Sequence, residues 1–330
     1  MDAKLPTTFN ARSAAELLAS ASAYATQEKA ASTRRGYRSD WRDFAAWCER
    51  VGAVAMPSQP TVAAAYFAHL ADSGLSAGTI ARRVAAISYA HKLKGLDSPT
   101  TVEAVRQVLR GIRRAIGAKP NQKAPATDRA MAAMLAHVPE VLIGVRDRAI
   151  LLIGFAAALR RSEIVALRIA DIEIVPEGMI VHIRSSKTDQ EGVGQQVAVP
   201  RGGRMRVVEA FEAWRQCLDN VSTMSPGFKG GLNPAEFLFR SINRHGRIGA
   251  AALTDRSIAD IVKRYAAAAG LDPSTFSGHS LRAGFVTSAL EHGADIFKVM
   301  DVTRHRTVET LKSYDRRAKA FRDHAGKDFL

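Results

Sequence analysis

The chain reads AILLIGFAAALRRSEIVAL over residues 149–167. Its apolar run from Ala149 to Leu159 is too short to cross a bilayer and is better explained as a buried helix. The run ends at Arg160, after which a second, amphipathic helix is predicted. Glu163 follows three residues later, where its carboxylate can brace the guanidinium of Arg160 or cap the new helix. We therefore expect a cation at the end of a core helix, held there by a carboxylate.

The rest of the C-terminal part is predicted to be mainly helical with a small antiparallel sheet, an α+β arrangement. Met179–Arg184 is rich in apolar residues, and Gln195–Val199 returns after a loop of Ser, Lys, Thr, Asp and Gly, which favours a hairpin with a polar tip. Helices are expected over residues 128–137, 144–158, 207–220, 254–269, 279–292, 296–302 and 307–317.

The N-terminal part is predicted to be all helical. Residues 14–29 are rich in alanine and short of helix breakers. Thr33 and Ser76 are candidate caps at the starts of two further helices, and residues 101–116 form another. The apolar stripes of these three helices are Tyr37, Trp41, Phe44 and Cys48; then Ile80, Val84 and Ile87; then Val105, Leu109, Ile112 and Ile116.

Arginines lie beside two of these apolar stripes. A basic ridge next to an apolar face suits a helix that packs on its own domain and lays guanidinium groups along DNA phosphates. A merely solvated basic face is the alternative. The candidate DNA-binding residues are Arg82 and Arg83 on one helix and Arg106, Arg110, Arg113 and Arg114 on another.

A change of composition separates the two parts. Residues 117–126 read GAKPNQKAPA, and two prolines, a glycine and polar residues are typical of an exposed linker. We therefore expect a flexible N-terminus over residues 1–12, a helical domain over 13–116, the linker over 117–126, and a second domain with a C-terminal tail over 127–330.

Positive charge is in excess in both parts. The chain holds 47 Lys and Arg against 32 Asp and Glu, a formal net charge of +15. Residues 1–120 contain 17 basic and 9 acidic residues, and the remainder contains 30 and 23. An excess spread over two domains favours a polyanion clamped between them. Nucleic acid is therefore the expected partner, and a soluble protein that happens to be basic is the alternative.

The two cysteines, Cys48 and Cys217, lie far apart in the sequence. They make neither a disulfide framework nor a zinc site, and no apolar block with a cleavage site begins the chain. We expect a protein of the reducing cytoplasm, with no membrane partner, no small-molecule substrate, no cofactor and no metal.

Four short segments supply what phosphodiester cleavage without a metal requires. That reaction needs a nucleophile, cations around the phosphorus-bound oxygens, and an acid for the leaving oxygen. Taken singly, each segment is weak evidence for a catalytic site, because such residues usually form surface ion pairs or pack as ordinary side chains. The candidates are Arg160, Lys187 at the predicted hairpin tip, His279 and Arg282 in a His-x-x-Arg pattern, His305, and Tyr314 nine residues later.

Taken together and in this order, the segments resemble the tyrosine recombinase (phage integrase) family and its two-domain, Cre/Xer-like members. The family signature is Arg, Lys, His-x-x-Arg, then His or Trp, then Tyr, and every element is present. The resemblance covers nearly the whole chain. It implies a helical, SAM-like core-binding domain that binds DNA, followed by a catalytic domain of the DNA breaking-rejoining type.

The chain departs from the family pattern at two positions. Many members place a glycine directly before the third-motif histidine, where this chain has Arg304, and another histidine where it has Ala283. Neither change removes a catalytic side chain. Arg304 is a further candidate for contact with DNA.

Two catalytic assignments keep an alternative. Arg161 competes with Arg160, although only Arg160 lies two residues before Ser162 as the motif requires. Arg184 is the nearest alternative to Lys187, although it is expected to end the strand.

The resemblance also implies a role for each candidate. Tyr314 attacks the scissile phosphate, which gives a 3′-phosphotyrosyl link and a free 5′-hydroxyl. Arg160 and Arg282 bind the non-bridging oxygens, Lys187 protonates the leaving oxygen, His279 assists proton transfer or orients the phosphate, and His305 donates a hydrogen bond. Strand exchange between two duplexes then needs neither ATP nor a metal. It needs a homotetramer assembled on double-stranded DNA at inverted-repeat recombination sites.

Two other functions fit parts of the pattern. A relaxing enzyme of the type IB topoisomerase kind shares much of the chemistry, and a catalytically silent DNA-binding protein would keep the fold. The short helical domain and the nine-residue step from His305 to Tyr314 favour the recombinase over the first. The complete set of candidate catalytic residues favours it over the second.

Overall fold

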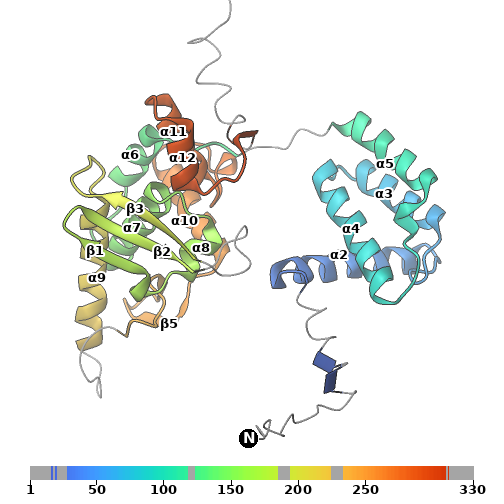
Figure 1. Cartoon of the computed structure of the whole chain (residues 1–330), viewed down its shortest axis with the longest axis horizontal. Helices are drawn as coiled ribbons and strands as arrows, with labels where there is room; N and C mark the ends of the chain where they lie inside the picture. The colour runs from blue at the N-terminus through green and yellow to red at the C-terminus, as the bar shows by residue number, and fades with distance from the viewer. Residues whose placement is uncertain are drawn as a thin grey trace, which may run out of the picture. The chain divides into compact units, whose positions relative to one another are not determined.

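The computed structural model describes residues 16–17, 19–20, 28–117, 123–184, 194–223, 233–309 and 311, with the backbone only at 31 and 221–223. The chain divides into two compact units, residues 1–121 and 122–330 (Figure 1). The division falls inside the predicted linker. The mainly helical fold with a small antiparallel sheet confirms the expected fold class.

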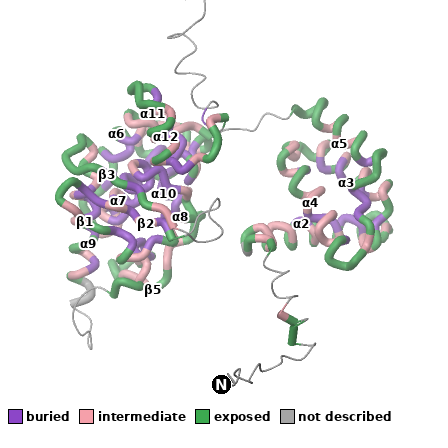
Figure 2. The backbone as a smooth tube through the Cα atoms, viewed as in Figure 1, coloured by how far each residue is buried: buried purple, intermediate pink, exposed green. Residues whose placement is uncertain are grey.

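The N-terminal unit consists of helices around one aromatic-rich core. Its elements are α2 (Ala31–Arg50), α3 (Pro60–Asp72), α4 (Ala77–Leu93), the short 3-10 helix η1 (Pro99–Thr101) and α5 (Glu103–Ile116). Phe44, Tyr66 and Phe67 are fully buried between them, and the ring centroids of Phe44 and Tyr66 lie 5.0 Å apart. Figure 2 shows the buried residues along the inner faces of these helices.

Helix starts in this unit match the sequence prediction in one case and not in another. The hydroxyl of Ser76 accepts a hydrogen bond from the backbone N–H of Thr79, so the predicted cap of α4 is confirmed. Thr33 lies inside α2, which begins at Ala31, so its prediction as a cap is wrong.

At the other end of the unit, Ile116 is 41% exposed and does not join the apolar stripe of α5. The predicted helix over 14–29 falls mostly outside the described residues, and Glu28 and Lys29 form a bend.

The C-terminal unit is larger and combines helices with two small sheets. Its helices are α6 (Asp128–Ala136), α7 (Leu142–Ala156), α8 (Arg161–Ala166), η2 (Ile169–Asp171), α9 (Val207–Thr223), α10 (Asp255–Ala268), η3 (Pro273–Thr275), α11 (Ser280–Glu291) and α12 (Ile296–Thr303). Its strands are β1 (Ile172–Val175), β2 (Gly178–Ile183), β3 (Gln195–Pro200), β4 (Arg240–Ile242) and β5 (Ile248–Ala252).

Helix α7 is the centre of this unit and is buried on nearly every side, as the apolar run predicts. A Cβ added at Gly154 would lie 2.8 Å from side-chain carbons of both Ile164 on α8 and Leu281 on α11. The absence of a side chain at Gly154 therefore lets α8 and α11 meet against the end of α7. This packing brings the first and third sequence motifs together.

The predicted hairpin is present as β2 and β3, which pair antiparallel with Ile183 opposite Gln195. A third strand, β1, extends this sheet beside β2, and β4 and β5 form a separate hairpin. The sequence analysis did not predict β1, β4 or β5, because such short strands carry too little alternation to be recognised. The tip of the β2–β3 hairpin, residues 185–193, lies outside the described residues.

The second half of the predicted linker is part of the C-terminal unit. The backbone N–H of Ala124 donates to the carbonyl of Thr275, and that of Ala126 donates to the carbonyl of Ser280. Ala126 is fully buried, and a Cβ added at Gly284 on α11 would lie only 1.8 Å from its carbonyl oxygen. The linker prediction is therefore wrong for residues 123–126, which pack on the helix that carries Arg282.

We predict that Gly284→Ala destabilises the C-terminal unit by about 1–3 kcal/mol, because the new methyl group must displace backbone rather than a flexible side chain. Gly111→Ala is the matched control, since α5 leaves open space around Gly111 and alanine favours a helix by about 0.5–1 kcal/mol. Chemical denaturation should show opposite signs for the two variants. A neutral Gly284→Ala would contradict the close approach of α11 to residue 126.

Candidate active site

Arg160 lies at a sharp turn between α7 and α8. Ala158 has a φ of 47°, in the left-handed region that is unfavourable for any residue with a Cβ. The carbonyl of Ala158 accepts a hydrogen bond of 2.8 Å from Nη1 of Arg282 on α11. Arg282 thus stabilises the turn that positions Arg160, so the two candidate catalytic arginines are linked through Ala158.

Glu163 makes both of the contacts that the sequence left open. Its Oε2 accepts from the backbone N–H of Arg160 at 2.9 Å, which caps α8, and its Oε1 accepts from Nη1 of the same arginine at 2.7 Å. The carboxylate is only 2% exposed, whereas the Arg160 side chain is 19% exposed. Glu163 therefore fixes the backbone and one guanidinium nitrogen of Arg160 and leaves part of the guanidinium accessible.

His279 and Arg282 lie on the same turn at the start of α11. Arg282 is 1% exposed, while His279 keeps an exposed surface. The pKa of His279 is lowered by partial burial of its ring and then by the positive charges of Arg282, Arg160 and Arg161. These charges act only at short range in a protein, so the first and third motifs share one electrostatic environment.

His305 completes this group from the end of α12. Burial of its ring, and then Arg282, Arg160, His279 and Arg304, lower the pKa of His305 to about 4. The imidazole is therefore neutral near pH 7. Four predicted site residues (Arg160, His279, Arg282 and His305) come together in the structure, although they lie on three separate segments of the chain.

The hydroxyl of Thr303 controls the proton position on His305. Its Oγ1 donates to the carbonyl of Val299 at 2.7 Å and lies 2.8 Å from Nδ1 of His305. While the hydroxyl proton points to Val299, Nδ1 of a neutral His305 must carry the ring proton, and Nε2 is an acceptor. If the hydroxyl turns to donate to Nδ1, the proton moves to Nε2, where it can be donated to a phosphate oxygen. The sequence analysis did not single out Thr303, because its role depends on this contact.

Two predicted catalytic residues, Lys187 and Tyr314, lie outside the described residues. The alternatives for two assignments are occupied elsewhere. Arg184, 57% exposed, pairs with Asp171 at 2.5 Å, and Arg161 pairs with Asp255 on α10 at 3.2 Å.

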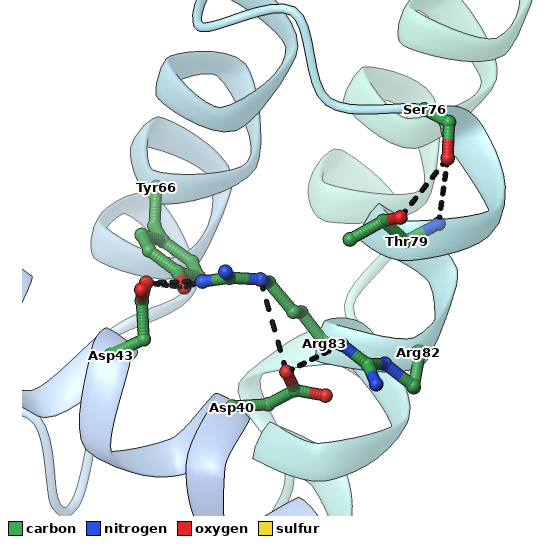
Figure 3. Close-up of polar contacts among 7 residues, drawn as sticks. All are labelled: Asp40, Asp43, Tyr66, Ser76, Thr79, Arg82 and Arg83. Atoms are coloured by element: carbon green, nitrogen blue, oxygen red, sulfur yellow. Dashed lines mark hydrogen bonds and ion pairs between the residues drawn. The ribbon is translucent and has the colours of Figure 1, made fainter. Parts of the chain in front are cut away.

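The structure turns Arg83 inward in the N-terminal unit (Figure 3). Its guanidinium donates to Asp43 and to the hydroxyl of Tyr66, and its Nε lies 4.0 Å from Asp40. Its side chain is only 15% exposed. Arg83 thus links α2, α3 and α4, which corrects its prediction as a DNA contact.

Arg82 faces outward beside it. Its Nη2 donates to Asp40 at 2.9 Å, and its side chain is 54% exposed (Figure 3). Burial raises the pKa of Asp40, and the charges of Arg82 and Arg83 oppose that shift. One guanidinium nitrogen of Arg82 is therefore held by Asp40, while about half of its side chain remains accessible.

Further exposed cations lie on α5, on α2 and at the tip of the β4–β5 hairpin. The four predicted arginines of α5 are all exposed, and Arg110 among them pairs with Glu103. The sequence analysis did not single out the others, although the i, i+3, i+7 spacing on α2 is a recognisable signal. The exposed groups are Arg106, Arg110, Arg113 and Arg114 on α5; Arg35, Arg38 and Arg42 on α2; and Arg244, His245 and Arg247 at the hairpin tip.

Arg304, the remaining predicted DNA contact, is buried. Its side chain is 4% exposed, and its Nη2 donates to Oε2 of Glu163 at 2.7 Å. This position corrects its prediction as an exposed contact with DNA.

Within the described ranges, no helix is both long and apolar enough to cross a bilayer. Within the same residues, no three His, Cys, Asp or Glu side chains are grouped as possible metal ligands.

The chain thus has a helical unit followed by a unit in which arginines and histidines gather, and its relatives are DNA breaking-and-rejoining enzymes. The model of the phage integrase family matches residues 126–320. An integrase/recombinase XerD homolog of Selenomonas ruminantium is 36% identical over 304 residues, which cover 91% of this chain and 85% of that protein. The Cre recombinase of Escherichia phage P1 is 26% identical over 291 residues, covering 83% and 81%. The chain therefore belongs to the phage integrase family, the tyrosine recombinases.

Solved structures agree with this fold. The Tn1549 transposon integrase in complex with transposon right-end DNA superposes with a TM-score of 0.59 at 18% identity, covering 91% of this chain and 98% of that one. The XerH site-specific recombinase bound to palindromic difH substrate gives a TM-score of 0.56 at 18% identity, covering 81% and 71%.

We predict that Arg160→Met raises the pKa of His305 above its value of about 4, because the variant removes a positive charge that disfavours the imidazolium. Arg161→Met is the matched control, since Arg161 is among the charges that lower the pKa of His279 and is not among the main causes of the lowered pKa of His305. An NMR titration of histidine-labelled protein measures both, with His305→Gln assigning the resonance. Equal shifts of the His305 pKa in the two variants would contradict the placement of Arg160 beside His305.

Proposed function

We propose that this protein is a site-specific recombinase that cleaves and rejoins DNA through a 3′-phosphotyrosyl intermediate, with Tyr314 as the nucleophile. The observation that carries the proposal is the convergence of Arg160, Arg282, His279 and His305. The two guanidinium groups lie close enough to both imidazoles to lower their pKa values, and an anion bound beside them would offset the positive charge gathered there. A phosphodiester is the anion that the family and the basic chain favour.

The proposed chemistry begins at the tyrosine. An unperturbed phenol has a pKa of about 10 and is a poor nucleophile, so the cations of the site are needed to favour deprotonation of Tyr314 as it attacks. The phenolic proton passes to His279 or to solvent, the tyrosine oxygen attacks the phosphorus, and the bond from phosphorus to the 5′ oxygen breaks. Lys187 supplies a proton to that leaving oxygen, which becomes the free 5′-hydroxyl.

The remaining groups bind the phosphate as its charge is redistributed. Arg160 and Arg282 hold the non-bridging oxygens with planar guanidinium groups, which match the geometry of a phosphate. His279 orients the phosphate or assists proton transfer. His305 donates from Nε2 when the hydroxyl of Thr303 turns to its Nδ1, so this donation needs no protonation of a ring whose pKa is about 4.

The phosphotyrosyl link retains the free energy of the broken bond. A 5′-hydroxyl from a second duplex can therefore attack it and release Tyr314, which completes strand exchange without ATP. Exchange between two duplexes requires several active sites, so we propose a homotetramer on inverted-repeat sites in the cytoplasm. The exposed arginines of α5, together with Arg82, bind the phosphates of the double helix.

We predict that the protein forms a covalent adduct with DNA. The target is a duplex selected by the protein from a random-sequence pool, offered with nicks that tile the selected sequence so that the 5′-hydroxyl fragment diffuses away. A denaturing gel should show the adduct, and Tyr314→Phe should abolish it because the nucleophilic oxygen is lost.

Tyr89→Phe, which removes a hydroxyl from the N-terminal unit, is the matched control and should keep the adduct. Arg282→Ala should slow its formation by about 10²–10³-fold, the usual effect of losing one transition-state donor. No adduct at any nick position would refute the proposed function in favour of a silent DNA-binding protein. Relaxation of supercoils without site preference would favour a topoisomerase.

We also predict that Arg113→Gln combined with Arg114→Gln lowers the salt dependence of binding to the selected duplex. Each lost phosphate contact should reduce the slope of log K against log salt by about 1. Arg201→Gln serves as a control of equal type, because an ion pair with Glu212 occupies that arginine. Fluorescence anisotropy at several salt concentrations gives the slopes, and an unchanged slope in the double variant would remove α5 from the DNA interface.

A further inference from the structure

Arg304 occupies a backbone position that is unfavourable for arginine. It ends α12 with a φ of 59° and a ψ of 39°, in the left-handed region. Glycine adopts this conformation without cost, and many family members have glycine there, whereas other residues are strained by it. A side chain at this position must therefore make contacts that offset the strain.

The side chain of Arg304 reaches the turn between α7 and α8. Its Nη2 donates to Oε2 of Glu163 at 2.7 Å and lies 3.5 Å from the carbonyl oxygen of Ala158. These are the two acceptors that also hold the catalytic arginines, since Glu163 accepts from Arg160 and Ala158 accepts from Arg282. The guanidinium of Arg304 thus contacts both of these acceptors.

The charge of this arrangement matters for phosphate binding. A buried carboxylate paired with Arg160 alone would neutralise the cation that has to bind the phosphate. In this structure the carboxylate of Glu163 is divided between Arg160 and Arg304, whose side chains are 19% and 4% exposed. The more deeply buried Arg304 balances the carboxylate, and Arg160 keeps positive charge for its ligand.

We propose that Arg304 is a positioning residue that acts through Glu163: it fixes the carboxylate that orients Arg160 and ties the turn carrying His305 to the same point. The proposal rests on the proposed function, because the reaction it serves is the attack of Tyr314 on a phosphate bound by Arg160. Arg304 contacts Glu163 and Ala158, the residues that hold the catalytic arginines, and does not itself bind DNA. A glycine at this position would leave the His305 turn without a charged link to α8.

A double-mutant cycle on Arg304 and Glu163 tests this proposal. Single-turnover cleavage of the selected, nicked duplex is measured at saturating protein for Arg304→Met, Glu163→Gln and the combined variant, with Kd measured separately. We expect Arg304→Met to slow cleavage at least tenfold while Kd changes less than twofold. The combined variant should be no slower than the slower single variant, because the two residues act as one unit. Lys298→Met, an exposed cation on the same helix, should leave both quantities unchanged.

Three results would overturn the proposal. Arg304→Met could cleave at the wild-type rate, the two single effects could multiply in the combined variant, or Kd could weaken in proportion to the cleavage rate as expected of a direct DNA contact. If Arg304→Met does not fold, Arg304→Gly removes the same ion pair and also relieves the backbone strain. Wild-type cleavage by Arg304→Gly would then refute the proposal. Adduct formation by the wild-type protein separates these outcomes from failure of the proposed function, since only the latter predicts no adduct.

Discussion

Repulsion among neighbouring arginine side chains governs how this site is arranged. Two like charges 4 Å apart repel by about 4 kcal/mol near a protein surface, and three arginines with two histidines meet at the junction of α7, α8, α11 and α12. The structure offsets this repulsion with one buried carboxylate, Glu163, and one backbone carbonyl, that of Ala158. Burial, and then the neighbouring guanidinium charges, lower the pKa of both His279 and His305, which favours their neutral forms and limits the charge of the site. A phosphate is the ligand that would relieve what repulsion is left.

The surrounding fold explains how such a cluster is held. Close packing at Gly154 and at Gly284 brings α8, α11 and residues 123–126 against one another, so the arginines cannot relax apart without disturbing the core. Arg282 donates a hydrogen bond to the carbonyl of Ala158, whose backbone is strained, so the strained turn directly contacts a residue of the site. Rigid support of this kind keeps charged groups in place for a transition state without reorganisation during the reaction.

Much of this organisation could be predicted from the sequence, because its signals are local. The buried α7, the cap at Ser76 and the contacts between Arg160 and Glu163 depend on residues only a few positions apart. Features that depend on distant partners could not be predicted. The side chain of Arg83 turns inward because Asp43 and Tyr66 accept its hydrogen bonds from neighbouring helices. Arg304 is buried because it pairs with Glu163, which lies 141 positions earlier in the chain. Residues 123–126 pack on the C-terminal unit because the carbonyl groups of Thr275 and Ser280 accept from their backbone. Short strands such as β4 form through pairing that no local pattern records.

A crystal structure of Tyr314→Phe bound to its selected duplex would show whether these separated side chains bind a single phosphate. We expect guanidinium nitrogens of Arg160 and Arg282 and the Nε2 of His305 to lie about 2.7–3.2 Å from oxygens of one phosphate, with residue 314 facing it in line with the 5′ oxygen. A scissile phosphate bound elsewhere, or either guanidinium turned away from it, would show that these side chains do not form one phosphate site.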